Sequence, residues 1–190
     1  MSRLTSIFVT LTFGVLIGVG VTSLRAQNTQ GLPGKLAGDF MHVGIIVPNV
    51  EQASKDLTGI FGLEARPASN NGGFGFPAAF GGDPKSYPKV VSYKVAEGLT
   101  LELLEPVGGK SPWRDFLELT NGAGGLHHLA FSVNDLEQQM AFLQQKGGKP
   151  EFGGIVQTAS PPPRTVRFAY VSMRPKLGMT LELVRLPQGQ

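Results

Sequence analysis

Two of the chain's three histidines occupy the same position in a repeated segment. His42 is the third residue of FMHVGIIV at 40–47, and His128 is the third residue of LHHLAFSV at 126–133. A single histidine in a strand is usually hydrogen-bonded or solvated, but recurrence at matching positions favours a shared role. Imidazole nitrogens are common ligands of Zn, Ni, Co, Mn and Fe. The repeat therefore predicts that His42 and His128 bind one divalent metal ion.

Two glutamates recur in the same way at the far end of each half. Glu102 is the fourth residue of LTLELL at 99–104, and Glu182 is the fourth residue of MTLELV at 179–184. Two nitrogens and two oxygens would leave about two coordination positions for water or substrate oxygens. Such a metal ion can stabilise negative charge on a substrate oxygen while a proton leaves the neighbouring carbon. Glu102 or Glu182 could then loosen from the metal and act as the base.

Strand periodicity decides which of these side chains can meet, because successive side chains point to opposite faces of a sheet. The apolar residues that alternate with the four candidates should pack against helices, and they are Val43, Ile45, Val47, Leu101, Leu103, Leu129, Phe131, Val133, Leu181 and Leu183. The two histidines and two glutamates then project from the other face. If the two halves pack about a pseudo-twofold axis, the four side chains converge.

His127 is the remaining histidine. It aligns with Met41 in the repeat, which predicts that it lies on the helix side of its strand and has a structural role. Because His127 and His128 are adjacent, an exchange of roles between them stays open.

The elements that must position these residues follow the same repeat. Each first strand precedes a capping residue, Asn49 or Asn134, and then an amphipathic helix. Gly62 and Gly147 end the two helices. Further strand candidates lie at 89–95 and 165–172. The sequence therefore predicts an α+β fold in which each half forms a strand, a helix and a small antiparallel set of strands, giving two similar sheets.

Length and composition fit one globular domain. The chain has 190 residues, of which 41% are hydrophobic and 16% charged, and it has no cysteine, which excludes disulfides and thiolate ligands. Arg3 and Arg25 lie in the N-terminal segment, and taking them from the 17 basic residues leaves 15 against 14 acidic ones. This balance, with basic residues scattered along the chain, argues against a nucleic-acid partner.

Residues 1–26 have the pattern of a secretory signal peptide. An early arginine precedes an apolar run at 7–24, and Ala26 comes before a polar stretch. The apolar run is also just long enough to span a bilayer, so the alternative is an uncleaved membrane anchor. In either case we expect the body outside the cytoplasm, periplasmic or extracellular, with 27–39 as a linker and 40–187 as the folded domain.

Residues 40–187 resemble the vicinal oxygen chelate superfamily, which includes glyoxalase I, methylmalonyl-CoA epimerase and extradiol dioxygenases. The segments that carry the resemblance are 42–45, 102–106, 111–112, 116–117 and 125–131. The family implies one cup-shaped domain of two βαβββ modules, here about 40–107 and 126–187, around one divalent metal ion. Its ligand positions fall on His42, Glu102, His128 and Glu182.

The resemblance implies a metal-dependent enzyme with isomerase, epimerase or lyase activity on a small oxygenated substrate, such as a carbonyl compound or a hydroxy acid. The resemblance implies that the dioxygenases have a site of two histidines and one glutamate, whose fourth place is left vacant. In this chain Glu102 fills that place. One alternative is an extradiol-type dioxygenase, in which Glu102 would be a bystander. Another is a non-catalytic ligand-binding protein of the bleomycin-resistance type.

Three features separate the chain from the epimerases. These pair the metal-bound carboxylate with a second glutamate in the middle of the first half, and residues 65–93 offer no match. Residues 173–176 read Met-Arg-Pro-Lys where the epimerases have a His-Pro-Lys segment. Coenzyme A thioesters and glutathione adducts are mainly cytoplasmic, whereas this chain is predicted to be exported.

Two regions are candidates for substrate selection. The Gly-rich and aromatic stretch 70–80 could cover the centre or form a surface connection. In the second half, Arg164 or Arg167 could meet an anionic substrate. Homodimers are common in the superfamily, so the expected partners are a small-molecule substrate and, in a possible homodimer, a second copy of the chain. The membrane would be a partner only through the N-terminal segment.

Overall fold

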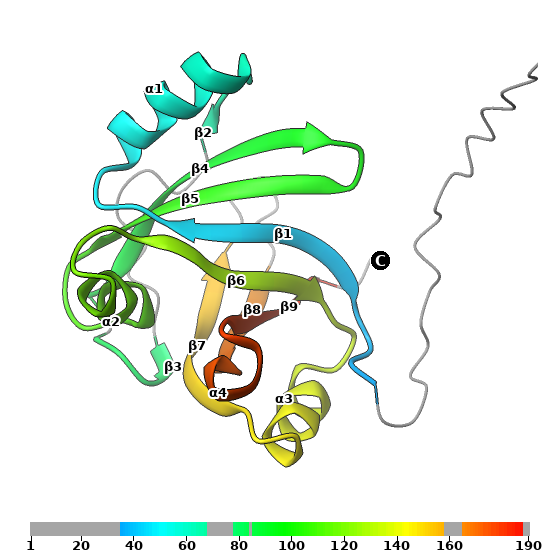
Figure 1. Ribbon diagram of the computed structural model, residues 1–190. Coiled ribbons are helices and arrows are strands. Elements are labelled where there is room, and N and C mark those ends of the chain that lie inside the picture. Colours follow the sequence, from blue (N-terminus) through cyan, green and yellow to red (C-terminus); the bar gives the residue numbers. More distant parts are fainter. Residues whose placement is uncertain (1–34, 68–77, 84, 158–164, 188–190) are drawn as a thin grey trace, which may run out of the picture.

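The computed structural model describes residues 35–67, 78–83, 85–157 and 165–187, which form nine strands and four helices (Figure 1). The strands are β1 (Asp39–Ile46), β2 (Arg66–Pro67), β3 (Ala78–Phe80), β4 (Tyr87–Ala96), β5 (Leu99–Val107), β6 (Gly125–Ser132), β7 (Lys149–Gln157), β8 (Thr165–Ser172) and β9 (Thr180–Arg185). The helices are α1 (Val50–Phe61), α2 (Pro112–Leu119), α3 (Leu136–Gln145) and α4 (Arg174–Leu177). These elements confirm the predicted α+β class, and the strand candidates at 89–95 and 165–172 correspond to β4 and β8.

The described strands belong to one sheet with the order β2-β4-β5-β1-β6-β9-β8-β7-β3. β1 runs parallel to β5, and β6 runs parallel to β9, while β1 and β6 pair antiparallel at the centre. Figure 1 shows β1 and β6 side by side, with α1 and α3 at opposite ends of the molecule. The prediction of two similar sheets is therefore wrong in one respect, because backbone hydrogen bonds between β1 and β6 join the halves into one sheet.

β3 departs from the arrangement of the other first-half strands. Ala78 and Phe80 pair with Gly154 and Gly153 of β7, at the far edge of the second half. The end of the predicted selection loop is thus fixed to the opposite half of the sheet. Its other residues, 70–77, lie outside the described residues.

Helices α1 and α3 begin at capping side chains. Asn49 accepts a hydrogen bond of 2.8 Å from the backbone N–H three residues later, and Gly62 ends α1 with a φ of 66°. In the second half the capping residue is Asp135, not the predicted Asn134, because α3 begins at Leu136 and the Asp135 carboxylate accepts the matching hydrogen bond of 2.9 Å. Gly147 follows α3 with a φ of 88°, as its position near the helix end predicts.

Helices α1 and α3 pack on one face of the sheet, and α2 packs on the other. On the face of α2, a cluster that we call the Trp113 cluster contains the buried residues Ile46, Val90, Leu104, Trp113, Phe152, Phe168, Tyr170 and Val184. The Trp113 ring lies 5.2 Å from the Phe152 ring and 5.6 Å from the Tyr170 ring, centroid to centroid. Because its members come from both halves, this cluster holds them together across the centre.

Helix α2 is not predicted in the sequence analysis. A helix-start signal is present, because Ser111 caps α2 and Pro112 is its first residue. Among the described residues, no helix has the length and apolar composition needed to cross a bilayer. The predicted signal peptide at 1–26 lies outside the described residues.

Candidate metal centre

The four predicted residues lie on four neighbouring strands at the middle of the sheet. Glu102 is on β5, His42 on β1, His128 on β6 and Glu182 on β9, and these strands are adjacent in that order. Each residue alternates with the apolar side chains that pack on α1 or α3. The four therefore share the other face of the sheet, as the periodicity predicts.

Three of these side chains meet in a buried cluster. His42 Nε2 lies 3.1 Å from Glu182 Oε2 and 3.3 Å from His128 Nε2. His128 Nε2 lies 3.2 Å from the same Glu182 oxygen. In the described part of the chain, these three form the one group of three or more candidate ligands whose atoms all lie within 4.8 Å of one another.

Glu102 is the outer member of the four. Its Oε2 lies 3.4 Å from His42 Nε2, and 27% of its side chain is exposed, against 11% for Glu182. It is not part of the three-residue group. Glu102 is thus close enough to reach an ion held by the other three and open enough to contact a small molecule.

The separations of the donor atoms fit a divalent metal ion. Nitrogen and oxygen ligands lie about 2.0–2.2 Å from Zn²⁺, so ligands in adjacent coordination positions are about 3–3.5 Å apart. The three separations of 3.1, 3.2 and 3.3 Å fall in this range. Imidazole and carboxylate donors suit Zn, Ni, Co, Mn or Fe. The centre could therefore hold one such ion.

Small residues on the facing strand make room for both imidazoles. In the β1–β6 pair, His128 is opposite Gly44 and His42 is opposite Ala130. A Cβ at position 44 would lie 1.8 Å from His128 Cε1, which is far inside the contact distance of two carbon atoms. The His128 ring therefore requires glycine at position 44.

The two carboxylates have opposite electrostatic environments. Burial would raise the pKa of Glu182, but hydrogen bonds from His128 and His42 hold that pKa well below its ordinary value. The pKa of Glu102 is raised, mainly because burial disfavours its charged form. Burial would lower the pKa of His42, yet the hydrogen bond to Glu182 raises it overall. Glu182 is thus suited to bind a cation, and Glu102 is suited to exchange a proton.

His127 lies on the same face as His128, and the prediction that it lies on the helix side is wrong. The pairing of β1 with β6 shifts between Gly44 and Ile45, which leaves His127 as an extra residue without a partner on β1. Such a β-bulge re-aims a side chain. His127 is fully buried, and its Nδ1 lies 3.0 Å from His128 Nδ1. The two histidines do not exchange roles, because it is His128 Nε2 that reaches Glu182.

Two further polar residues beside the centre are missing from the sequence analysis. Tyr170 is opposite Glu182 in the β8–β9 pair, and its ring centroid lies 5.1 Å from that of His128. Thr180 is fully buried beside His128, and its hydroxyl has no hydrogen-bond partner among the described residues. A search two positions along each strand would have found Thr180, which shares the face of Glu182. Only the pairing of β8 with β9 reveals Tyr170.

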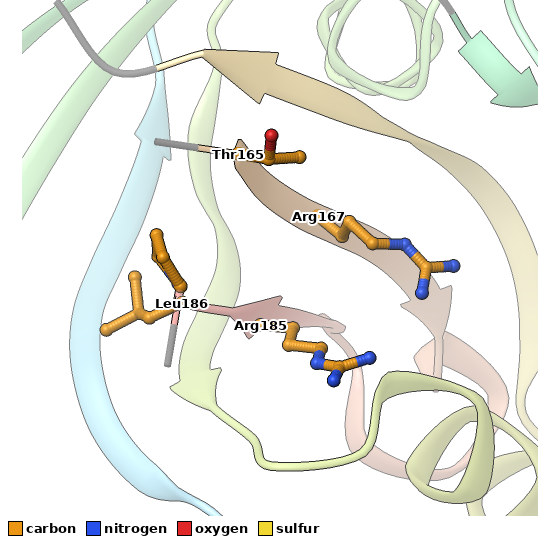
Figure 2. A pocket seen from close by; sticks show the side chains of 5 residues that line it. Thr165, Arg167, Arg185 and Leu186 are labelled. Carbon is orange, nitrogen blue, oxygen red and sulfur yellow. The ribbon is translucent and has the colours of Figure 1, made fainter. Parts of the chain in front are cut away.

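Arg167 does not lie beside the four residues, although the sequence analysis offered it as a contact for an anionic substrate. It alternates with Phe168 of the Trp113 cluster, so it lies on the opposite face of the sheet, where it pairs with Glu137. Arg167 and Arg185 line a hollow of about 380 Å³. Figure 2 shows both side chains on neighbouring strands. Arg164, the other candidate, lies outside the described residues.

The chain matches a known protein family and several of its characterised members. A family model described as Glyoxalase/Bleomycin resistance protein/Dioxygenase superfamily matches residues 41–168. The chain is 30% identical over 124 residues to the ethylmalonyl-CoA/methylmalonyl-CoA epimerase of Cereibacter sphaeroides, and the matched region covers 62% of this chain and 82% of that protein. It is 31% identical over 133 residues to the mitochondrial methylmalonyl-CoA epimerase of Homo sapiens, covering 66% and 67%.

Solved structures of the same kind share the fold. The methylmalonyl-CoA epimerase of Mycobacterium tuberculosis superposes with a TM-score of 0.55 at 20% identity, covering 84% of this chain and 95% of that one. A Streptomyces coelicolor methylmalonyl-CoA epimerase variant, in complex with 2-nitronate-propionyl-CoA, also gives 0.55 at 20% identity, covering 80% and 99%. At this identity the likeness shows the fold alone.

The close approach of Gly44 to His128 gives a test of the centre's architecture. Gly44→Ala should lower the free energy of unfolding by about 1–3 kcal/mol, because the new methyl group overlaps the His128 ring and must displace it. Chemical denaturation measures this change. Gly59→Ala on α1 is the matched control, because a Cβ there meets no atom within 4 Å. Equal stability of the two variants would contradict the geometry.

Proposed function

This chain belongs to the Glyoxalase/Bleomycin resistance protein/Dioxygenase superfamily, and from that premise we propose that it is a divalent-metal-dependent enzyme that removes and returns a proton beside a carbonyl group. Its curated relatives are methylmalonyl-CoA epimerases, which supports isomerase or epimerase chemistry. The observation that carries the proposal is the meeting of two imidazoles and two carboxylates on one face of the sheet.

The four residues divide the work according to burial and charge. His42, His128 and Glu182 would hold the ion, with Glu102 as the fourth ligand. The bound ion would supply Lewis-acid stabilisation of negative charge on a substrate oxygen. Glu102 would loosen from the ion to act as the base, because its 27% exposure lets it contact a substrate.

Epimerisation also needs a group that returns the proton on the other side of the reacting carbon. Glu102 on β5 and Glu182 on β9 flank the two histidine strands, so they approach the centre from opposite sides. Glu182 is the second candidate carboxylate, and to return the proton it would have to loosen from the ion and from His128 and His42, whose hydrogen bonds favour its charged form. An isomerase that returns the proton from the side of its removal would need Glu102 alone.

The proposed substrate is a small carbonyl compound or hydroxy acid outside the cytoplasm. The signal-like pattern at 1–26 supports this location. In the β4–β5 pair the residue opposite Glu102 is Ser92, and the first half thus offers no second carboxylate there. Both points favour a substrate other than a coenzyme A thioester.

A second candidate function rests on the tight group itself. Two histidines and one glutamate, without Glu102, form the donor set of non-haem Fe(II) oxygenases. An extradiol-type dioxygenase would use this set and leave Glu102 as a bystander. The behaviour of Glu102 variants therefore separates the two candidates.

We expect about one divalent metal ion per chain when the full-length protein is purified without chelators or added metal. His128→Ala and Glu182→Ala should lose the ion, because each removes a buried ligand atom. Glu102→Ala should also lose it if four residues bind. Elemental analysis gives the metal content, and Glu97→Ala is the control, because that carboxylate is exposed and pairs with Lys94.

The metal measurement has two contrary outcomes. Wild-type protein that holds no ion, and takes up none when Zn, Ni, Co, Mn or Fe is added, would sink the enzyme proposal and favour a ligand-binding protein. Full metal content in Glu102→Ala would favour the three-ligand, dioxygenase-like centre.

Proton transfer can be followed directly in heavy water. Metal-loaded wild-type protein should exchange the proton beside the carbonyl of its substrate for deuterium, and Glu102→Gln should slow this about 10²–10⁴-fold. The glutamine keeps an oxygen ligand but no base. Proton NMR of a substrate panel of carbonyl compounds, hydroxy acids and methylmalonyl-CoA measures the exchange. Oxygen uptake with catechols, in place of exchange, would contradict the epimerase proposal.

The location outside the cytoplasm is tested by cell fractionation. The chain, produced in bacteria with its N-terminal segment intact, should appear in the periplasm with Gln27 as its first residue if the leader is cleaved after Ala26. Recovery of uncleaved chain in the membrane fraction would support the anchor. Uncleaved chain in the cytoplasm would refute export.

A further inference from the structure

A line of polar contacts runs from His128 of the metal centre through His127 to the partly buried ion pair of Arg174 and Glu151. His128 Nδ1 lies 3.0 Å from His127 Nδ1, and His127 Nε2 lies 3.1 Å from an Arg174 terminal nitrogen. The other terminal nitrogen of Arg174 lies 3.8 Å from Glu151 Oε1. The Arg174 guanidinium also lies over the Phe116 ring, with its Cζ atom 5.5 Å from the ring centroid. Both histidines are fully buried, so water does not replace these partners.

The guanidinium fixes where the protons of this line must be. Arginine stays protonated in proteins and can only donate hydrogen bonds. His127 Nε2 must therefore accept from Arg174, so a neutral His127 carries its proton on Nδ1. That proton points at His128 Nδ1, which must accept it. A neutral His128 then has its own proton on Nε2, where it donates to Glu182 Oε2 at 3.2 Å.

A metal ion requires the reverse arrangement. An ion on His128 Nε2 needs the lone pair of that nitrogen, so the His128 proton must sit on Nδ1 and point at His127 Nδ1. His127 would then carry its proton on Nε2, facing the N–H of Arg174. Two donors would face each other at 3.1 Å in a buried site, and neither would have an acceptor.

We propose that Arg174 is a positioning residue that, through His127, holds His128 in the tautomer that opposes metal binding, so that the ion and the Arg174–His127 hydrogen bond exclude one another. This inference rests on the proposed function, because it concerns an ion bound by His128. The number of protons on the histidine pair does not change. One proton moves from His127 Nδ1 to His128 Nδ1, and the proton lost from His128 Nε2 balances the one gained at His127 Nε2.

Arg174 has an alternative partner nearby. Glu151 Oε2 and Arg174 Nε are both buried without a hydrogen-bond partner in the described part of the chain. The existing ion pair between the two residues is long, at 3.8 Å. When His127 no longer accepts, the guanidinium can turn to Glu151 and use these atoms in a paired hydrogen bond. Metal binding would thus exchange one partner of Arg174 for another.

Arg174→Gln separates this role from a general effect of charge. The glutamine carbonyl can accept from His127 Nε2–H, so His128 is free to present its lone pair, and the Zn²⁺ dissociation constant should fall about 10–100-fold. Arg174→Lys keeps a charged donor and should bind Zn²⁺ as the wild type does. Lys176→Gln is the control, because it removes the same charge from α4 at an exposed position that contacts Lys146 instead. Its affinity should stay within about threefold of wild type.

Nitrogen-15 NMR of the histidine rings, in metal-free full-length protein, reads the tautomers without any reference to activity. Wild type and Arg174→Lys should show protonated Nε2 and unprotonated Nδ1 in His128. Arg174→Gln should show a larger fraction of His128 with its proton on Nδ1, because the glutamine amide can accept from His127 as well as donate to it. A His128 proton on Nδ1 in the metal-free wild type would overturn the proposal. So would equal Zn²⁺ affinities in Arg174→Gln and Lys176→Gln. If no variant binds Zn²⁺, the proposed metal function fails, while the NMR result decides the role of Arg174 separately.

Discussion

The antiparallel pairing of β1 with β6 is the constraint on which the centre depends. It joins the two halves, and it places His42 and His128 on adjacent strands with their Nε2 atoms 3.3 Å apart. Each imidazole sits over a small residue of the other strand, Ala130 or Gly44. Larger side chains at these two positions would force the strands or the rings apart. The parallel partners β5 and β9 then only need to add one carboxylate each from the two outer sides.

The sequence predicts the residues of this centre because their alternation with apolar side chains is regular within each strand. It does not predict the side of His127, because a β-bulge adds one residue and reverses the alternation. β1 has a matching shift between Phe40 and His42, and the skipped Met41 packs against the Trp113 cluster. The alignment of Met41 with His127 was thus sound, while the side assigned to both was wrong. Bulges are set by pairing between strands, which periodicity within one strand does not contain.

The remaining differences also arise from contacts between distant segments. β3 pairs with β7 of the second half, and the composition of residues 78–80 does not predict this partner. Tyr170 reaches the centre because β8 pairs with β9, and Arg174 reaches His127 across 47 positions of sequence. Local signals were sufficient only where the determinant is local, as for the Asn49 cap and Gly62. Even there, a neighbouring carboxylate displaced the predicted cap by one residue, to Asp135.

Burial makes the proton pattern of the centre as important as its ligand set. On the face with the Trp113 cluster, buried hydrogen bonds are strong and an unmatched donor is costly. Where His42 Nε2 and His128 Nε2 donate to Glu182, their protons occupy the positions that an ion would take. Ligands must release those protons to bind, so proton placement and metal affinity are one equilibrium. Arg174 is two contacts away from His128 along this line of hydrogen bonds. Under the proposal, the residue at position 174 would thus change the metal affinity of the four-residue set without contacting the ion.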